Sequence, residues 1–148
     1  MIIDGRKMAA EVLARTRVRA LELGRRPNVL VYVAPNETPA TRSYLKIKAK
    51  SAEAAGCDFE ETRSLTFSTQ ADSIIVQLPL SPEVNTTDVL NSIPVEKDPD
   101  VLSSKSIGCF VSGQSAILPP VVGALKYIFD KNNIEIKGKK VVVIGFGR

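Results

Sequence analysis

The sequence contains no histidine and no tryptophan, and only two of its 148 residues are cysteines. The absence of histidine excludes Ser-His-Asp and Cys-His catalysis, histidine-ligated zinc and a histidine acid–base pair. Cys57 and Cys109 are too few for a four-cysteine metal site, and we interpret them as reduced, buried side chains of a cytoplasmic protein. We therefore expect no metal, and any acid–base chemistry must come from Lys, Tyr, Asp or Glu.

Aromatic residues make up only 5% of the chain, which gives no stacking platform for single-stranded nucleic acid. No apolar run approaches 18 residues, and the first eight residues carry charges where a signal peptide needs apolar side chains. These absences predict a cytoplasmic protein that binds neither nucleic acid nor a membrane. Lys and Arg number 20 against 16 Asp and Glu, and a small polyanionic ligand explains this mild net charge of +4 as well as nucleic acid would.

Hydrophobic spacing predicts alternating helices and strands in the first half of the chain. Asp4 can cap a helix that runs to about Gly24, with an apolar stripe formed by Met8, Ala9, Val12, Leu13, Thr16, Ala20 and Leu21. Apolar runs at 29–33 and 73–78 are typical of strands buried on both faces, and a helix over 40–55 lies between them. This order predicts an α/β fold, a three-layer αβα domain with a mainly parallel sheet.

One connection does not fit this scheme. A polar strand is predicted over 58–63, and the linker from Arg63 to Ser73 is too short for a crossover helix between parallel strands. Either the 58–63 strand pairs unusually, or residues are missing around 66–71.

The second half is predicted to contain a short helix over 86–92, a long loop over 94–113 and a helix over 121–131. A buried strand over 139–144 then runs into a glycine turn at Gly145-Phe146-Gly147. Such a turn after a strand can cradle a phosphate, although an isolated Gly-x-Gly is a weak signal.

Four polar side chains could carry chemistry. Tyr44 and Lys48 are four residues apart on one helix, so they share a face, and a neutral lysine there could move a proton. Gln77 lies in an apolar strand near its carboxyl end, where α/β sheets place their sites, and Asp100 lies in the long loop. Each also has a simpler explanation, because surface lysines, strand-end amides and loop aspartates are common without any function.

Six motifs in order resemble the bifunctional methylenetetrahydrofolate dehydrogenase/cyclohydrolase family of FolD type. They are Asp4-Gly5-Arg6, the 39–48 stretch PATRSYLKIK, Val76-Gln77-Leu78-Pro79-Leu80, Lys97-Asp98-Pro99-Asp100, Pro119-Pro120 to Gly123, and 141–147. The resemblance covers nearly the whole chain. It implies a folate-binding catalytic domain over 1–120, followed over 121–148 by a connecting helix and the start of a Rossmann-type cofactor domain.

The resemblance also implies a reaction pair in the one-carbon metabolism that serves purine biosynthesis. Methylenetetrahydrofolate would be oxidised with NADP, or NAD, and the methenyl product hydrolysed to 10-formyltetrahydrofolate. Lys48 would handle the proton, Gln77 would hydrogen-bond Lys48, Tyr44 would stack on the folate and Asp100 would hold the pterin. The folate pocket would also include Val76, Leu78 and Pro79, and the cofactor would face Gly145, Phe146 and Gly147.

The resemblance further implies a homodimer formed through the cofactor domain, and we expect the 148 residues alone to lack dehydrogenase activity. Several features depart from the family pattern: Val101 replaces a usual glycine, Pro119-Pro120-Val121 lacks the Cys-Thr-Pro pattern, Phe146 stands where some members have arginine, and the segment after Arg63 lacks a helix. The first two of these departures favour, as an alternative, a degenerate or truncated relative that binds folate without turnover. An unrelated α/β nucleotide-binding domain is the third interpretation.

Overall fold

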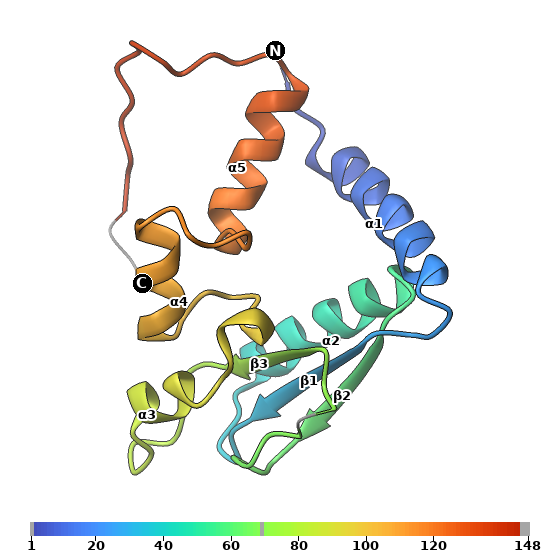
Figure 1. Ribbon diagram of the computed structural model, residues 1–148, viewed down its shortest axis with the longest axis vertical. Coiled ribbons are helices and arrows are strands. Elements are labelled where there is room, and N and C mark those ends of the chain that lie inside the picture. Colours follow the sequence, from blue (N-terminus) through green and yellow to red (C-terminus); the bar gives the residue numbers. More distant parts are fainter. Residues whose placement is uncertain (1, 69, 146–148) are drawn as a thin grey trace.

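The computed structural model describes residues 2–68 and 70–145 of the chain. In chain order its elements are α1 (Gly5–Glu22), β1 (Asn28–Val33), α2 (Pro39–Ala54), β2 (Asp58–Thr62), β3 (Ser73–Gln77), α3 (Thr86–Asn91), the 3-10 helix η1 (Val95–Lys97), α4 (Ser104–Val111) and α5 (Pro120–Lys131) (Figure 1). None of the helices in these ranges is both long and apolar enough to cross a membrane.

The three strands form one parallel sheet in the order β2-β1-β3, which confirms the predicted α/β fold with a parallel sheet. Because β1 is central, its side chains pack on both faces of the sheet, and residues 30–33 are buried. This is why its sequence is a continuous apolar run rather than an alternating one.

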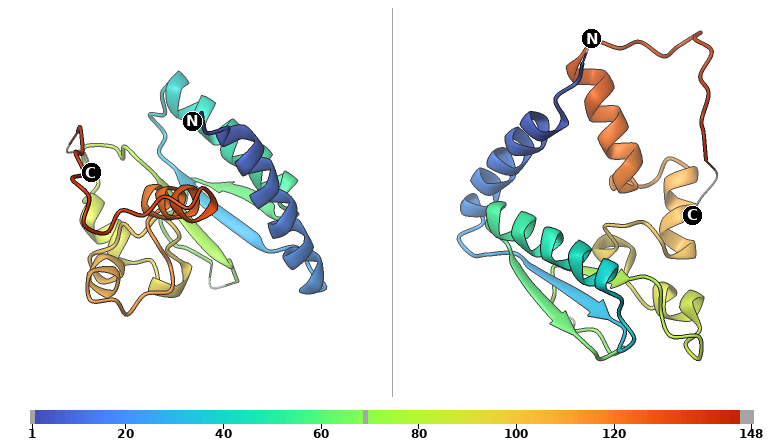
Figure 2. Two further views of the ribbon diagram at one scale, coloured as in Figure 1. Left: turned by 90° about the horizontal axis from the view of Figure 1, so that it is seen from above. Right: turned by 180° about the vertical axis from the view of Figure 1, so that it is seen from behind.

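Helix α2 covers one face of the sheet (Figure 2). Val31, Val33 and Leu45 are fully buried there, and Val29, Phe59 and Ile75 pack around them. Strand side chains alternate between faces, so Gln77, two residues after Ile75, lies on the face that α2 covers. The sheet therefore brings the end of β3 towards the helix that carries Lys48.

The opposite face is covered by α3, η1 and the connections around them. Its core contains Leu30, Tyr32, Ala34, Ala71, Ile74, Val76, Leu80, Leu90 and Ile93, with Phe67 and Leu102 among the partly buried side chains against it. Helices and connections on both faces of one sheet give the layered arrangement expected from the βαβ order.

The connection from β2 to β3 is made without a crossover helix. Residues 63–68 and 70–72 form no helix, and β2 and β3 each pair with β1 rather than with one another. When fully extended, a connection of this length spans roughly 33 Å. The crossover has to run back along a five-residue strand, ~17 Å, and sideways across two strand spacings of ~4.8 Å each, and this path is shorter than the reach of the connection. Phe67 and Ala71 pack on the face opposite α2, so the crossover needs no helix.

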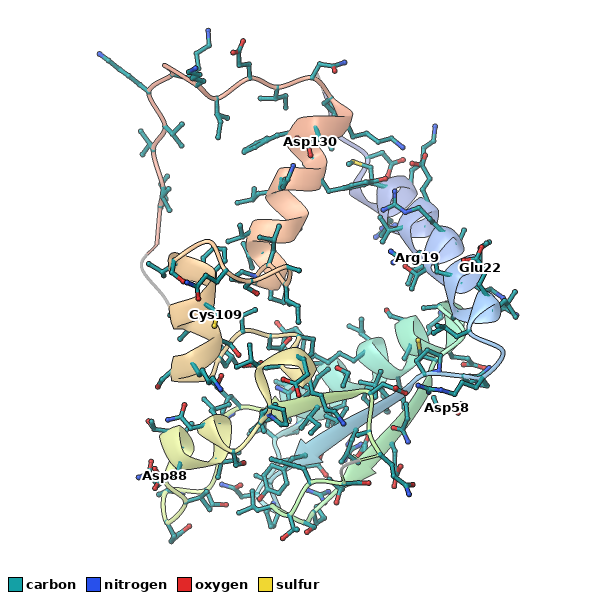
Figure 3. The ribbon with its side chains drawn as sticks, viewed as in Figure 1. Arg19, Glu22, Asp58, Asp88, Cys109 and Asp130 are labelled. Atoms are coloured by element: carbon teal, nitrogen blue, oxygen red, sulfur yellow. The ribbon has the colours of Figure 1, made fainter. Side chains whose placement is uncertain are left out.

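The first helix is confirmed, but most of its predicted apolar stripe is not buried. Asp4 caps α1 by accepting a hydrogen bond from the Lys7 amide, 3.0 Å away. Of the predicted stripe only Met8 and Ala20 are buried, whereas Leu21 is 71% exposed. Arg19 and Glu22 of α1, which project in different directions, are also exposed (Figure 3). The stripe prediction fails because α1 contacts α2 at few points and does not lie on the sheet.

Two predictions for the second half are wrong. The expected loop over 94–113 contains η1 and α4, and Ser103 caps α4 by accepting from the Ser106 amide. The expected buried strand over 139–144 forms no strand, and Val142, Val143 and Ile144 are all more than four-fifths exposed. A parallel strand is stabilised only by neighbouring strands, and none lies beside this segment within the described residues.

Candidate functional site

Helix α2 presents two of the predicted side chains near the sheet. Thr38 caps the helix by accepting from the Thr41 amide, and Leu45 anchors it by packing, fully buried, on β1. Tyr44 and Lys48 are one turn apart on this helix; Tyr44 is 64% exposed and Lys48 is partly buried. The helix is thus fixed by Leu45, while the phenol and the amine remain accessible to a ligand.

Gln77 is the last residue of β3 and has one unused buried polar atom. Its side-chain Nε2 donates to the Leu78 carbonyl at 2.9 Å, and its Oε1 is buried without a hydrogen-bond partner. The expected hydrogen bond between Gln77 and Lys48 is not among those in the described part of the chain. A buried acceptor without a donor is costly, so Oε1 is suited to accept from a lysine or a ligand.

Asp100 approaches Lys48 from the loop between η1 and α4. Its Oδ2 lies 3.9 Å from the Lys48 Nζ, which makes this the ion pair that joins α2 to the second half of the chain. Burial raises the pKa of the Asp100 carboxyl, Lys48 opposes this shift, and the nearby charge of Asp98 adds to it. The structure therefore brings together Lys48 and Asp100, two residues that are 52 positions apart in the sequence.

Val101, next to Asp100, adopts a backbone conformation that disfavours its side chain. Its φ is 54°, in the left-handed region, although the residue is β-branched and 4% exposed. This is the position where the sequence departs from the glycine of the FolD pattern. The backbone conformation that such a glycine would adopt freely is here imposed on valine, at a cost of about 1–3 kcal/mol.

We expect Val101→Gly to be more stable than Val101→Ala by about 1 kcal/mol, because only glycine escapes the left-handed penalty. Urea unfolding of both variants measures this difference. The matched pair at Val31, a fully buried residue in the regular β1 strand, should show the reverse order, with Ala more stable than Gly. The same order at both positions would contradict strain at Val101.

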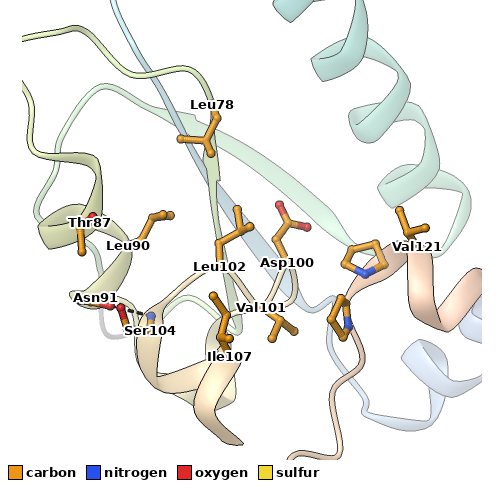
Figure 4. A pocket seen from close by; sticks show the side chains of 12 residues that line it. Leu78, Thr87, Leu90, Asn91, Asp100, Val101, Leu102, Ser104, Ile107 and Val121 are labelled. Atoms are coloured by element: carbon orange, nitrogen blue, oxygen red, sulfur yellow. Dashed lines mark hydrogen bonds between the residues drawn. The ribbon is translucent and has the colours of Figure 1, made fainter. Parts of the chain in front are cut away.

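A cavity of about 660 Å³ opens beside Asp100, between α3, α4 and the start of α5 (Figure 4). It is lined by Leu78, Thr87, Leu90, Asn91, Asp100, Val101, Leu102, Ser104, Ile107, Pro119, Pro120 and Val121. Of the predicted site residues, Asp100 and Leu78 line it, whereas Tyr44, Lys48 and Gln77 do not. Val76 is buried in the core, and Pro79 is exposed after a cis peptide bond.

Most of the cavity wall was not predicted. Thr87, Leu90 and Asn91 come from α3, and Ser104 and Ile107 come from α4, a helix where the sequence predicts a loop. The Asn91 Oδ1 accepts a hydrogen bond from the Ser104 amide at 2.8 Å and so joins the two helices (Figure 4). The available signal was the Ser103–Ser106 capping pattern, which marks the start of a helix.

The predicted cofactor residues are only partly described. Gly145 is an exposed residue with a φ of 105°, and a Cβ built on it would meet nothing within 4 Å. Phe146 and Gly147 lie outside the described residues. In the ranges 2–68 and 70–145, no group of three His, Cys, Asp or Glu side chains could hold a metal ion.

Comparison with known proteins supports the resemblance found in the motifs. No protein-family model matches the chain. A bifunctional protein FolD from Moorella thermoacetica is 32% identical over 162 positions, covering 97% of this chain and 58% of that protein. One from Maricaulis maris is 32% identical, covering 97% of this chain and 54% of the relative. The chain therefore spans little more than half the length of these relatives.

The fold of this chain is also similar to that of a FolD protein of known structure. The crystal structure of Trypanosoma brucei methylenetetrahydrofolate dehydrogenase-cyclohydrolase (FolD), complexed with NADP cofactor and inhibitor, matches 92% of this chain and 53% of that protein. The TM-score is 0.79 and the sequence identity is 25%. The 162-position alignment with the Moorella protein is longer than the 148-residue chain, so that relative has residues without a counterpart here. Over nearly its whole length, this chain is a homologue of the bifunctional FolD dehydrogenase/cyclohydrolase proteins.

Proposed function

We propose that this chain binds a tetrahydrofolate derivative and hydrolyses 5,10-methenyltetrahydrofolate to 10-formyltetrahydrofolate. The observation that carries the proposal is the approach of Lys48 to Asp100, with Nζ and Oδ2 3.9 Å apart, beside a cavity that Asp100 lines. The homology to FolD proteins supports the substrate class.

The reaction requires a group that accepts a proton from water. Water adds its oxygen to the bridging carbon of the methenyl group while Lys48, as the neutral amine, takes one proton. The bond from that carbon to N5 then breaks, the remaining hydroxyl proton passes to N5, and the carbon stays on N10 as a formyl group. One proton is released overall through Lys48. Positioned proton transfer of this kind contributes about 10²–10⁴-fold to a rate.

The other residues have roles that follow from their positions. The buried, unpartnered Oε1 of Gln77 would accept a hydrogen bond from Lys48 once a ligand separates Lys48 from Asp100. Asp100 would accept hydrogen bonds from the pterin, and its place on the cavity wall next to Leu78 fits an aromatic ring with polar edges. Tyr44 is exposed enough to stack on the ligand.

The dehydrogenase activity belongs to the same proposal. NADP, or NAD, would supply the hydride acceptor, and the open backbone at Gly145 suits the approach of a cofactor phosphate. The proposal also includes a preference for NADP, a cytoplasmic location and a homodimer formed through a cofactor domain. For the 148 residues alone we expect no reduction of NADP.

Calorimetry with tetrahydrofolate and a hydrolysis assay with methenyltetrahydrofolate test the proposal on the 148-residue chain. Binding and turnover together are the expected result, and absence of folate binding would overturn it. Binding without turnover would instead favour the second candidate, a non-catalytic folate-binding relative. The strained Val101 beside Asp100 and the Pro119-Pro120 wall are the features that favour this second candidate.

A further inference from the structure

Asp98 is the most deeply buried charged side chain in the described residues, with 1% of its surface exposed. Its Oδ2 accepts hydrogen bonds from the amides of Leu102 at 3.1 Å and Ser103 at 3.0 Å. Its own carbonyl accepts from the Val101 amide at 3.4 Å. A buried carboxylate needs such donors, and here both amides that reach it, those of Leu102 and Ser103, come from the chain that follows it within five residues.

These hydrogen bonds close a loop around Pro99, Asp100 and Val101. The loop contains the cavity carboxylate, Asp100, and the residue with the unfavourable backbone conformation, Val101. A left-handed valine persists only where surrounding interactions impose it. The bonds to the Asp98 carboxylate supply that constraint, since they fix the loop on both sides of Val101 and also hold Ser103, the cap of α4.

We infer that Asp98 is a positioning residue: by holding Val101 in its left-handed conformation, it keeps the Asp100 carboxylate directed at Lys48 and the cavity. This inference rests on the proposed folate site, because the consequence of the positioning is substrate binding. Asp98 itself lines no part of the cavity and is not a catalytic residue.

Among the described residues, the other groups around Asp100 do not hold its loop in place. The charged groups that act on Asp100 are Lys48, from α2, and Asp98, from its own loop. The cavity walls contributed by Leu78, α3, α4 and the start of α5 carry no charge, so they cannot orient the carboxylate by ion pairing. Lys48 approaches only to 3.9 Å, beyond hydrogen-bond distance, and so does not fix the loop.

A double-variant experiment on the full chain tests the inference. Asp98→Ala should weaken tetrahydrofolate binding, measured by calorimetry, by about 10- to 100-fold, as expected when a binding group moves by about 1 Å. Adding Val101→Gly should recover most of this loss, because glycine adopts the left-handed conformation without being held. Asp72→Ala is the matched control: Asp72 also accepts from a backbone amide, that of Asn28, but it lies at the opposite end of the sheet.

Unchanged binding in Asp98→Ala would overturn the inference. So would a loss that Val101→Gly fails to recover, because the role would then be general packing. If Asp98→Ala does not fold, Asp98→Asn keeps the shape and removes the charge, and the same comparison with Val101→Gly applies.

A second readout separates this inference from the proposed function. In Asp98→Asn, hydrogen exchange of the Leu102 and Ser103 amides should quicken by about tenfold or more, while the Thr87 amide, bonded to Asn85, stays unchanged. If the parent chain bound no folate, the proposed function would fail, and these exchange rates would still decide whether Asp98 holds the loop. Unaltered exchange at Leu102 and Ser103 would overturn the inference in either case.

Discussion

Lys48→Met is expected to lower kcat for hydrolysis of methenyltetrahydrofolate by about 10²–10⁴-fold, with a smaller effect on KM. Methionine keeps the length of the lysine stem but can neither accept nor donate the proton. Because the ammonium group is partly buried and faces Asp100, its removal changes chemistry more than packing. The rate is measured by following the disappearance of the methenyl compound at saturating concentration.

Lys50→Met is the matched control for this prediction. Lys50 lies on the same helix, α2, but is exposed and forms no ion pair in the described structure, so its replacement should leave the rate within about twofold of the parent. Hydrolysis by Lys48→Met at the parent rate would remove Lys48 from the mechanism. An equal loss in both variants would point to the general charge of the helix instead.

Asp100→Asn is expected to weaken tetrahydrofolate binding by about 10- to 100-fold, because a hydrogen bond to a charged acceptor contributes about 1.5–3 kcal/mol. The cavity wall should otherwise stay intact, since asparagine has nearly the same size. Calorimetry measures the change. Asp88→Asn makes the same change at an exposed aspartate of α3 that does not line the cavity, and it should change binding by less than about threefold.

The pH dependence of binding distinguishes the carboxylate from a neutral acceptor. Burial raises the pKa of Asp100, so the ionised form that accepts hydrogen bonds is lost, as the pH falls, at a higher pH than for an ordinary aspartate. Binding by the parent should therefore weaken on acidification from about pH 7 towards pH 4. Binding by Asp100→Asn should lack this dependence, and a parallel decline in both would contradict the role of Asp100.

The elements that were predicted correctly are those whose burial can be inferred from their own residues. Residues 29–33 are apolar because β1 is buried on both faces, and residues 39–54 carry a helix fixed through Leu45. The same local patterns failed at 139–144, because an apolar run shows that a segment could be a buried strand but not that partner strands are present. The loop prediction over 94–113 was also wrong, because the prolines of this stretch favour a loop, whereas Ser103 caps α4 within it.

The candidate site was also predicted only in part. Tyr44 and Lys48 share a helix face by spacing alone, and the motif resemblance identified Gln77 and Asp100. Local spacing does not reveal that Asp98 is buried to hold the loop of Asp100, or that Val101 is left-handed. It also does not show Asn91 of α3 joined to Ser104 of α4 across a cavity. The contact between Asn91 and Ser104 depends on how α3 packs against α4. The hydrogen bonds of Asp98 are local in sequence, but they depend on the conformation of the loop and not on residue spacing.

The absence of histidine agrees with a site proposed to work through lysine, aspartate, glutamine and tyrosine. By itself, the sequence determined the parallel α/β fold, the helix that carries Lys48 and the relationship to FolD proteins, because these follow from local periodicity and contiguous motifs. Only the tertiary structure decided that Asp100 meets Lys48, and which side chains wall the cavity beside them. The physical reason is that the geometry of a site depends on how separate segments pack, and packing energy is shared between residues distant in sequence.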